Sequence, residues 1–373
     1  MRRNPSGTSC GRTPLWKDSP LRQLANRRVR LAAVLTAASL GLMACGSNDT
    51  GTDGGTDRAA EDSEASELMV GLAYDVGGRG DRSFNDAAAA GLDRAVEELG
   101  AEAEELSPNA SGSDRGDNLR QLAEDGFNPV IAVGFAYAES LEPVATDFPD
   151  TTFFIVDDNS IKADNVKALL FAEEEGSFLV GAAAALKSEA GSVGYIGGVE
   201  TPLLKKFEAG FVAGAKQVEP DVETQVKYLS QPPDFSGFGD PAKGKETANG
   251  MFDGGADVIY AAAGGSGVGV FQSALAKDGL AIGVDSDQYE SVGDATLQPV
   301  ILTSMIKRVD VAVFEALEKF SNDEDIPAET VFDLSTDGVG YSTSGGQVDD
   351  IKDQLDELKQ QIIDGEITVP DEP

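Results

Sequence analysis

The chain of 373 residues contains no histidine, only two cysteines and a single tryptophan. Histidine is the commonest general base, the usual base of serine triads and the commonest metal ligand in proteins. Its absence argues against most hydrolytic and metal-dependent enzymes, so we expect neither catalytic residues nor a metal site. Paired carboxylates such as Asp157-Asp158 are also found in glycosidases, so that class of enzyme stays an alternative. Adjacent pairs are, however, expected by chance among 65 acidic residues.

Positive charge is also scarce. The chain has 29 Lys and Arg against 65 Asp and Glu, which gives a net charge of −36. Such a surface repels nucleic acids and anionic lipid headgroups, so we expect neither as a partner. A high-salt habitat would produce the same bias, so the charge excludes partners without indicating a function.

The apolar run LAAVLTAASLGLM at 31–43 is too short for a comfortable transmembrane helix. It follows the basic RRVR at 27–30 and ends in small residues before Cys45, which is the pattern of a bacterial lipoprotein signal. We therefore predict a signal peptide over 1–44 and lipidation of Cys45, which would anchor the mature protein outside the cytoplasm. An ordinary secretory signal with an incidental cysteine is the alternative.

The other cysteine, Cys10, lies upstream of the predicted cleavage site. The mature chain would then keep one cysteine, so no disulfide framework and no cysteine metal site are expected. Residues 45–67 are polar, acidic and free of apolar periodicity, which predicts a flexible tether. The roughly 300 residues from 68 onward exceed what a single core usually holds, so two lobes are the default.

From residue 68 the sequence alternates between runs typical of buried strands and runs with helical spacing. The strand-like runs are 68–75, 128–136, 151–158, 192–198, 256–265 and 280–287. The helix-like runs are 87–99, 177–189, 205–218, 268–279, 304–320 and 351–365. This alternation predicts an α/β fold of doubly wound parallel sheets.

In such sheets, ligands bind beyond the carboxyl ends of the strands. Four of these ends carry unusual side chains: Asp75 to Asn85, Asp157 to Asn159, Gly264 to Gly267 and Asp285 to Gln288. Because four ends converge on similar chemistry, we predict that the binding site lies there.

Three local motifs are weaker than they look. Gly239–Lys245 has P-loop spacing, but Glu246 replaces the magnesium-binding hydroxyl and Pro241 removes a cradling N–H. The glycines at 264–269 miss the last position of a dinucleotide fingerprint, where Val270 stands. Arg79-Gly80-Asp81 is a three-residue match that we attribute to chance.

A flat, neutral, hydroxyl-rich ligand needs aromatic faces, carboxylate acceptors and a few donors. Residues at the strand ends and in the loops near them can supply all three: Phe84 and Phe238 to stack, Asp75, Asp158 and Asp285 to accept, Asn85 to do both, and Lys307 to donate. We expect Lys307 to lie at the start of a helix. Each residue alone has an ordinary structural reading, such as a core phenylalanine, a helix cap or a solvated lysine; together they favour a binding pocket.

Eight stretches resemble the basic membrane protein family, the PnrA-like substrate-binding lipoproteins of ABC transporters. They are DVGGRGDRSFNDAAAAGL, FAEEEGSFLVGAAAAL, GYIGG, FEAGFVAGAK, DPAKGKETA, AAAGGSGVGVFQSA, IGVDSDQ and LTSMIKRVDVAVF. They occur in order over residues 68–345. The resemblance implies a periplasmic-binding-protein type I fold, with two α/β lobes joined by three hinge crossovers.

The lobes implied in this way are 68–173 plus 303–330 and 174–302 plus 331–373, with hinges near 171–175, 286–303 and 330–340. The family is associated with purine and other nucleosides, which implies capture by lobe closure and delivery to a membrane permease. No cofactor is implied, and the family usually acts as a monomer. The alternative is the same fold binding a sugar or another small signalling ligand.

By matching motifs, the resemblance also implies roles for single residues. Phe84 would stack on the base, with Asn85 beside it and Asp158 reading the base edge. Asp285 and Lys307 would hold the ribose hydroxyls, while Asp75 and Gly265 would line the pocket. Phe238 would stack from the opposite side, although Phe235 could take that role instead.

Overall fold

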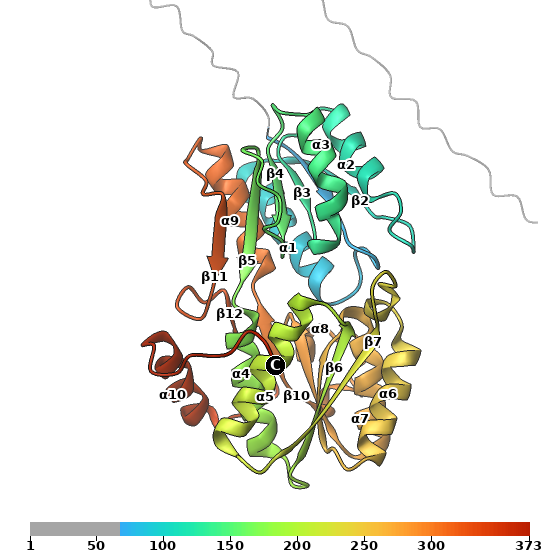
Figure 1. Ribbon diagram of the computed structural model, residues 1–373, viewed down its shortest axis with the longest axis vertical. Coiled ribbons are helices and arrows are strands. Elements are labelled where there is room, and N and C mark those ends of the chain that lie inside the picture. Colours follow the sequence, from blue (N-terminus) through green and yellow to red (C-terminus); the bar gives the residue numbers. More distant parts are fainter. Residues whose placement is uncertain (1–67) are drawn as a thin grey trace, which may run out of the picture. The chain divides into compact units, whose positions relative to one another are not determined.

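The computed structural model describes residues 68–373, which form two six-stranded sheets with helices on both faces of each (Figure 1). The first sheet has the order β11-β5-β4-β3-β1-β2, and every neighbouring pair is parallel. Its strands are β1 (Met69–Ala73), β2 (Glu102–Leu106), β3 (Val130–Ala132), β4 (Phe153–Val156), β5 (Val166–Phe171) and β11 (Glu329–Phe332). The inner strands β3 and β4 are fully buried, as parallel strands covered on both faces must be.

The second sheet repeats the arrangement with the order β12-β10-β9-β8-β6-β7. Its strands are β6 (Ser192–Val199), β7 (Glu223–Ser230), β8 (Val258–Ala262), β9 (Leu280–Asp285), β10 (Ile301–Lys307) and β12 (Val339–Tyr341). Only β12 is antiparallel, to β10. In both sheets the order reverses beside the first strand, at β1/β3 and at β6/β8, and ligands bind at such switch points.

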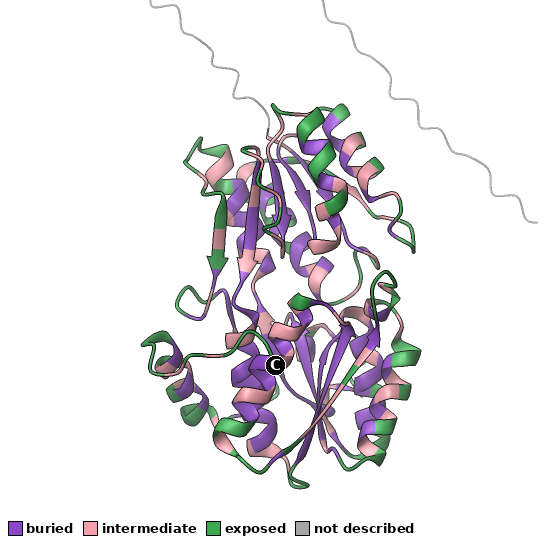
Figure 2. Cartoon of the chain, in the orientation of Figure 1, coloured by how far each residue is buried: buried purple, intermediate pink, exposed green. Residues whose placement is uncertain are grey.

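Helices cover the two sheets in pairs. The first sheet carries α1 (Phe84–Leu99) with α9 (Val309–Ser321) and α2 (Arg115–Glu124) with α3 (Ala138–Asp147); the second carries α4 (Glu173–Lys187) with α5 (Pro202–Val218) and α6 (Pro241–Asp253) with α7 (Gly267–Lys277). The short α8 (Gln288–Ser291) follows β9, and α10 (Lys352–Ile363) packs on α4. Figure 2 shows inner strands that are buried, an edge strand β11 that is largely exposed, and helices whose outer faces are exposed.

The chain crosses between the sheets three times, which confirms the predicted fold class. It passes from β5 to α4, from β10 to α9 and from β11 to β12. We call the first sheet with its helices lobe 1 and the second lobe 2. Among the described residues, no helix has the length and apolar character needed to cross a bilayer.

The sequence-based prediction was wrong at the second crossover. Residues 304–320 were expected to form one helix, but Ile301–Lys307 is strand β10 and the helix begins at Val309. The run ILTSMIK is rich in β-branched residues and buried on both faces, which favours a strand inside a sheet. The crossover therefore lies at Arg308, and residues 303–307 belong to lobe 2 instead of lobe 1.

The discounted P-loop spacing has a structural explanation. Asp240 caps α6, because its carboxylate accepts a hydrogen bond of 3.0 Å from the backbone N–H of Lys243. Pro241 occupies the first turn of the helix, where a missing N–H costs nothing.

Helices α4 and α5 pack closely through glycines. A Cβ at Gly214 would overlap the carbonyl oxygen of Phe178, and one at Gly181 would overlap that of Phe211. Both clashes involve backbone atoms, which cannot move aside cheaply. The close packing therefore depends on residues without a side chain.

We expect Gly214→Ala to lower the free energy of unfolding by about 1–3 kcal/mol, because overpacking forces the two helices apart. Gly250→Ala is the matched control: Gly250 lies inside α6 with no atom near its would-be Cβ, so alanine should stabilise by about 0.5–1 kcal/mol. Urea unfolding measures both. Equal effects of the two substitutions would contradict the packing argument.

Candidate functional site

A cavity lies between the lobes, where the carboxyl ends of both sheets meet. Its empty space is about 600 Å³, including the opening to solvent, which is within the usual range for small-molecule sites. The lining comes from both lobes and comprises Asp75, Val76, Asp81, Phe84, Asn85, Phe135, Asp157, Leu203, Leu204, Phe207, Phe238, Ala262, Gly264, Val284, Asp285 and Lys307.

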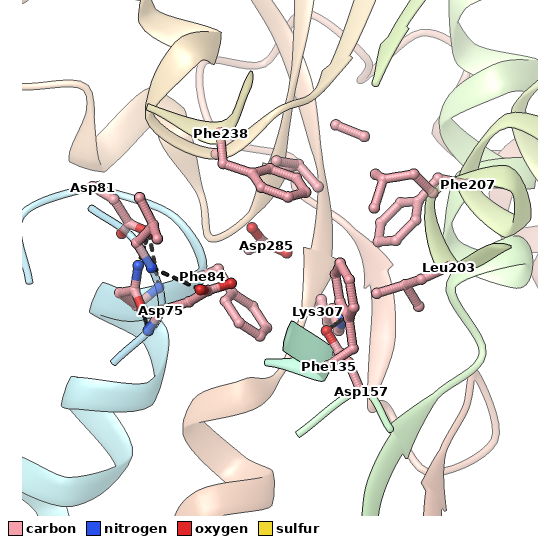
Figure 3. Close-up of a pocket in the computed structure, with 16 residues that line it drawn as sticks. Asp75, Asp81, Phe84, Phe135, Asp157, Leu203, Phe207, Phe238, Asp285 and Lys307 are labelled. Atoms are coloured by element: carbon pink, nitrogen blue, oxygen red, sulfur yellow. Dashed lines mark hydrogen bonds and ion pairs between the residues drawn. The ribbon is translucent and has the colours of Figure 1, made fainter. Parts of the chain in front are cut away.

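Four phenylalanines supply most of the aromatic surface. Phe84 begins α1 and Phe135 follows β3 in lobe 1, while Phe207 on α5 and Phe238 after β7 belong to lobe 2. Figure 3 shows Phe84 and Phe238 separated by the cavity, with Asp285 between them in this view. A planar ring could therefore contact aromatic faces from both lobes.

One buried lysine lies among carboxylates at the back of the cavity. Lys307 Nζ is 2.6 Å from Asp157 Oδ2 and 3.1 Å from Glu173 Oε1, and the three side chains are at most 4% exposed. The other oxygens, Asp157 Oδ1 and Glu173 Oε2, are buried without a hydrogen-bond partner in the described part of the chain. Of the two residues only Asp157 lines the cavity. Buried acceptors normally find donors, so Asp157 Oδ1 is suited to accept from a ligand hydroxyl group.

The pKa values of these groups are shifted because the groups are buried and because one lysine faces several carboxylates. Burial raises the pKa of Asp157 to about 7, although Lys307 opposes the shift. Burial likewise raises the pKa of Asp285 to about 6. Burial would lower the pKa of Lys307, but Asp157, Glu173 and Asp285 raise it more, so the lysine stays charged.

Two of these carboxylates are carried by unusual backbone. Asp157, just after β4, has φ 69°, and Asp285, at the end of β9, has φ 66°. Left-handed φ values are uncommon for residues other than glycine and gather at functional sites. Each aspartate thereby directs its carboxylate from the end of its strand toward the cavity (Figure 3).

The loop after β1 is held by its own polar side chains. The glycines Gly77, Gly78 and Gly80 have positive φ and allow the chain to turn. Asp81 accepts hydrogen bonds from the backbone N–H groups of Ser83 and Asn85 at 2.9 Å, which caps the start of α1. The aspartate of Arg79-Gly80-Asp81 therefore has a structural role.

Asn85 is tied into the same loop. Its Oδ1 accepts from the backbone N–H of Asp75 at 2.9 Å, and its Nδ2 donates to Asp81 at 3.0 Å. Asn85 lines the cavity, but these two bonds hold it in place. Asp75 in turn pairs with the buried Arg115, at 2.7 Å.

The lobes also touch at the rim of the cavity. Ser83 Oγ of lobe 1 donates to Asp285 Oδ2 of lobe 2 at 2.5 Å. The carbonyl oxygen of Arg82 accepts from Ser286 Oγ at 2.9 Å and from Gln288 Nε2 at 3.1 Å, and the Arg82 guanidinium donates to the carbonyl of Val292. These contacts hold the start of α1 against the end of β9.

The lining includes six of the eight residues named from sequence: Asp75, Phe84, Asn85, Phe238, Asp285 and Lys307. Lys307 ends strand β10 and does not begin a helix. Asp158 is outside the lining, and its Oδ1 accepts from the backbone N–H and hydroxyl of Ser160 at 2.8 and 2.6 Å. The cavity is lined by Asp157 instead of Asp158 and by Gly264 instead of Gly265.

Sequence reasoning missed several residues of the site. Phe135 follows a glycine at the end of β3 and could have been found as another strand-end aromatic. Phe207 and Glu173 lie on helices and carried no such signal. Phe235, the alternative stacker, is not in the lining; its ring meets Phe135 edge-on, with centroids 6.0 Å apart.

Because Lys307 compensates several buried carboxylates, we expect Lys307→Met to lower the free energy of unfolding by about 3–5 kcal/mol at pH 8. The loss should shrink toward pH 5, because carboxyls whose pKa values are raised to about 7 and 6 bind protons on the way down and stop repelling one another. Urea unfolding at both pH values measures this.

Lys359→Met is the control, since Lys359 forms an ion pair with Asp337, whose side chain is 83% exposed. Such pairs contribute little to stability. A loss for Lys307→Met that is independent of pH, or no larger than that of the control, would contradict the cluster's role.

The comparison with known proteins agrees with this architecture. A family model described as Bmp, ABC transporter substrate-binding protein PnrA-like, matches residues 69–373. The ABC transporter nucleoside-binding protein BmpA of Lactococcus lactis is 32% identical, over 93% of this chain and 99% of that protein. An uncharacterized lipoprotein of Pyrococcus abyssi is 35% identical, over 77% of this chain and 71% of its own length.

Among solved structures, an ABC transporter solute-binding protein from Aeropyrum pernix K1 superimposes with a TM-score of 0.70 at 30% identity. The match covers 81% of this chain and 94% of that one. The family model spans both lobes and all three crossovers. The chain therefore belongs to the Bmp family of PnrA-like ABC transporter substrate-binding proteins.

Proposed function

We propose that this protein captures nucleosides, with purine nucleosides first among them, between its two lobes and delivers them to a membrane permease. The observation that carries the proposal is the pairing of aromatic faces with a buried lysine and carboxylates in one cavity. A nucleoside presents the matching parts: a flat base with polar edges and a sugar with vicinal hydroxyls. The protein binds without chemistry; turnover of ATP belongs to the transporter's other subunits.

The assigned roles follow the geometry of the lining. Phe84 and Phe238 stack on the base from opposite lobes, and Asp75 and Asn85 lie beside it. Asp285 and Lys307 hold the ribose hydroxyls. Asp157 takes the acceptor role that the sequence assigned to Asp158, because Asp157 faces the cavity and has an unpartnered oxygen.

The charges also favour a neutral ligand over a phosphorylated one. Asp75, Asp81, Asp157 and Asp285 line the cavity, while Lys307 is the only basic residue in the described lining. That lysine is already paired with Asp157 and Glu173. A phosphate group entering the cavity would face uncompensated carboxylates at close range.

The location we propose is extracytoplasmic, with a lipid on Cys45 anchoring the protein near its permease. The support is the lipobox at Leu42–Cys45 and the relationship to a protein named as a lipoprotein. Cys45 lies outside the described residues. The protein acts as a monomer in this proposal.

Calorimetric titration of the full chain with adenosine, guanosine, inosine, uridine, ribose and free bases tests the ligand. We expect binding of nucleosides, strongest for the purine nucleosides, and weak binding of ribose alone. Heat from ribose without any preference for nucleosides would favour the sugar-binding alternative. Release of free base on long incubation would indicate an enzyme.

We expect Asp285→Ala to weaken the binding of every nucleoside by about tenfold or more, because a lost hydrogen bond to a charged group is worth about 1.5–3 kcal/mol. The binding of free bases should be unchanged. Asp294→Ala is the control, because Asp294 is exposed and is not part of the cavity lining. Equal losses for nucleosides and bases would refute the ribose assignment.

For the anchor, Cys45→Ser should release the protein from the membrane fraction of the producing cells, because the acylated thiol is lost. Cys10→Ser should leave membrane association unchanged. Fractionation followed by immunoblotting measures both. Continued membrane association of the Cys45 variant would refute lipidation there.

A further inference from the structure

Arg115 is a buried arginine that lies directly behind the ligand cavity. It begins α2 and is 5% exposed. Its Nη2 donates to Asp75 Oδ1 at 2.7 Å, and Asp75 lines the cavity. Arg115 therefore contacts the site only through another residue.

The same guanidinium reaches across to the other lobe. Its carbon lies 5.5 Å from the centroid of the Phe235 ring, which lobe 2 carries in the segment after β7. That ring also meets Phe135 of lobe 1 edge-on, at 6.0 Å. Tyr137 of lobe 1 flanks the guanidinium at 5.7 Å. Phe235 thus closes onto a surface formed by Arg115 and Phe135.

The arginine is held firmly within lobe 1. A Cβ on Gly112 would overlap its guanidinium, so the loop before α2 packs directly on the charged group. Arg115 Nε is buried without a hydrogen-bond partner in the described residues. In that part of the chain Asp75 is its one salt-bridge partner.

We propose that Arg115 is a positioning residue of the ligand site. It holds the Asp75 carboxylate toward the cavity, and its guanidinium packs against the Phe235 ring of the opposite lobe. The position of Asp75 and the closure of the lobes therefore depend on the same side chain. This inference rests on the proposed function where ligand affinity is concerned and is independent of it where closure is concerned.

The charges around Asp75 predict a pH dependence by which the proposal can be tested. Burial raises the pKa of Asp75, and Arg115 lowers it. The other groups near it are Tyr137, whose hydroxyl donates to the carbonyl of Tyr74 at 2.6 Å, and the backbone N–H of Val76, which donates to Asp75 Oδ1 at 2.7 Å. Neither can replace the arginine's positive charge. Without Arg115, only the backbone N–H of Val76 opposes the effect of burial on the pKa, and Asp75 binds a proton at higher pH.

The first test is the affinity for adenosine between pH 8 and pH 5.5, measured by calorimetry. Arg115→Met should weaken binding about tenfold at pH 8, and the loss should grow as the pH falls, because a protonated Asp75 loses its charge and accepts weaker hydrogen bonds from the ligand. Arg115→Lys should restore the pH profile in part but not the contact with Phe235, which needs the planar guanidinium.

Arg120→Met is the matched control on the same helix. Arg120 pairs with Asp147 at 2.7 Å and lies over the Phe148 ring at 5.5 Å, but its side chain is 38% exposed and outside the cavity. Because Asp157 and Asp285 should titrate in the same way in Arg115→Met and Arg120→Met, the ratio of the adenosine affinities of these two variants reports the effect of Asp75 protonation alone. If this ratio stays constant with pH, the proposal that Arg115 positions Asp75 is overturned.

The second test measures closure. Spin labels at Glu139→Cys and Lys243→Cys, exposed positions on α3 and α6, report the distance between lobes in the full chain with Cys10→Ser and Cys45→Ser. Arg115→Met and Phe235→Leu should both shift the population to longer distances, with and without adenosine, and Arg120→Met should not.

Unchanged distances in Arg115→Met and Phe235→Leu would overturn the role in closure. If Arg115→Met fails to fold, Phe235→Leu tests the same contact from the other lobe. Should the wild type bind no nucleoside, the proposed function fails, but the distances still decide whether Arg115 seats the opposite lobe.

Discussion

The ion pairs of Lys307 join the two lobes of this molecule at their crossovers. The lysine ends β10, immediately before the crossover to lobe 1. Its partners are Asp157, which follows strand β4 of lobe 1, and Glu173, which begins α4 after the crossover into lobe 2. Charges buried this deeply are stable only when they are paired, so the cluster fixes two crossovers and the back wall of the cavity together.

The ligand chemistry follows from the same constraint. One lysine serves several buried carboxylates, and some of their oxygens lack a hydrogen-bond partner among the described residues. Under the proposed function, the hydroxyl groups of the ligand would supply donors at this place, whereas an anion would add to the repulsion. Aromatic rings from both lobes complete the cavity, so in the proposed capture mechanism closure of the lobes would bring the stacking faces and the polar groups onto the ligand together.

Much of the fold could be predicted from sequence, because buried parallel strands and amphipathic helices leave clear periodic patterns. The segment 301–307 could not, since a short buried run before a helix reads equally well as its first turns. The strand-end rule found Asp75, Phe84 and Asp285 for a physical reason: the carboxyl ends of parallel strands share one edge. It could not separate Asp157 from Asp158, because the positive φ that turns Asp157 inward is invisible in the sequence.

Arg115, Glu173 and Phe207 lay beyond sequence reasoning for another reason. They reach the site, or the residues behind it, from helices that only the packed structure brings there. The most direct test of the central claim is a crystal structure of the full chain with adenosine. We expect the base to lie between Phe84 and Phe238, with ribose hydroxyls on Asp285 and Lys307. A nucleoside bound outside this cavity, or with its ribose directed away from Lys307, would contradict it.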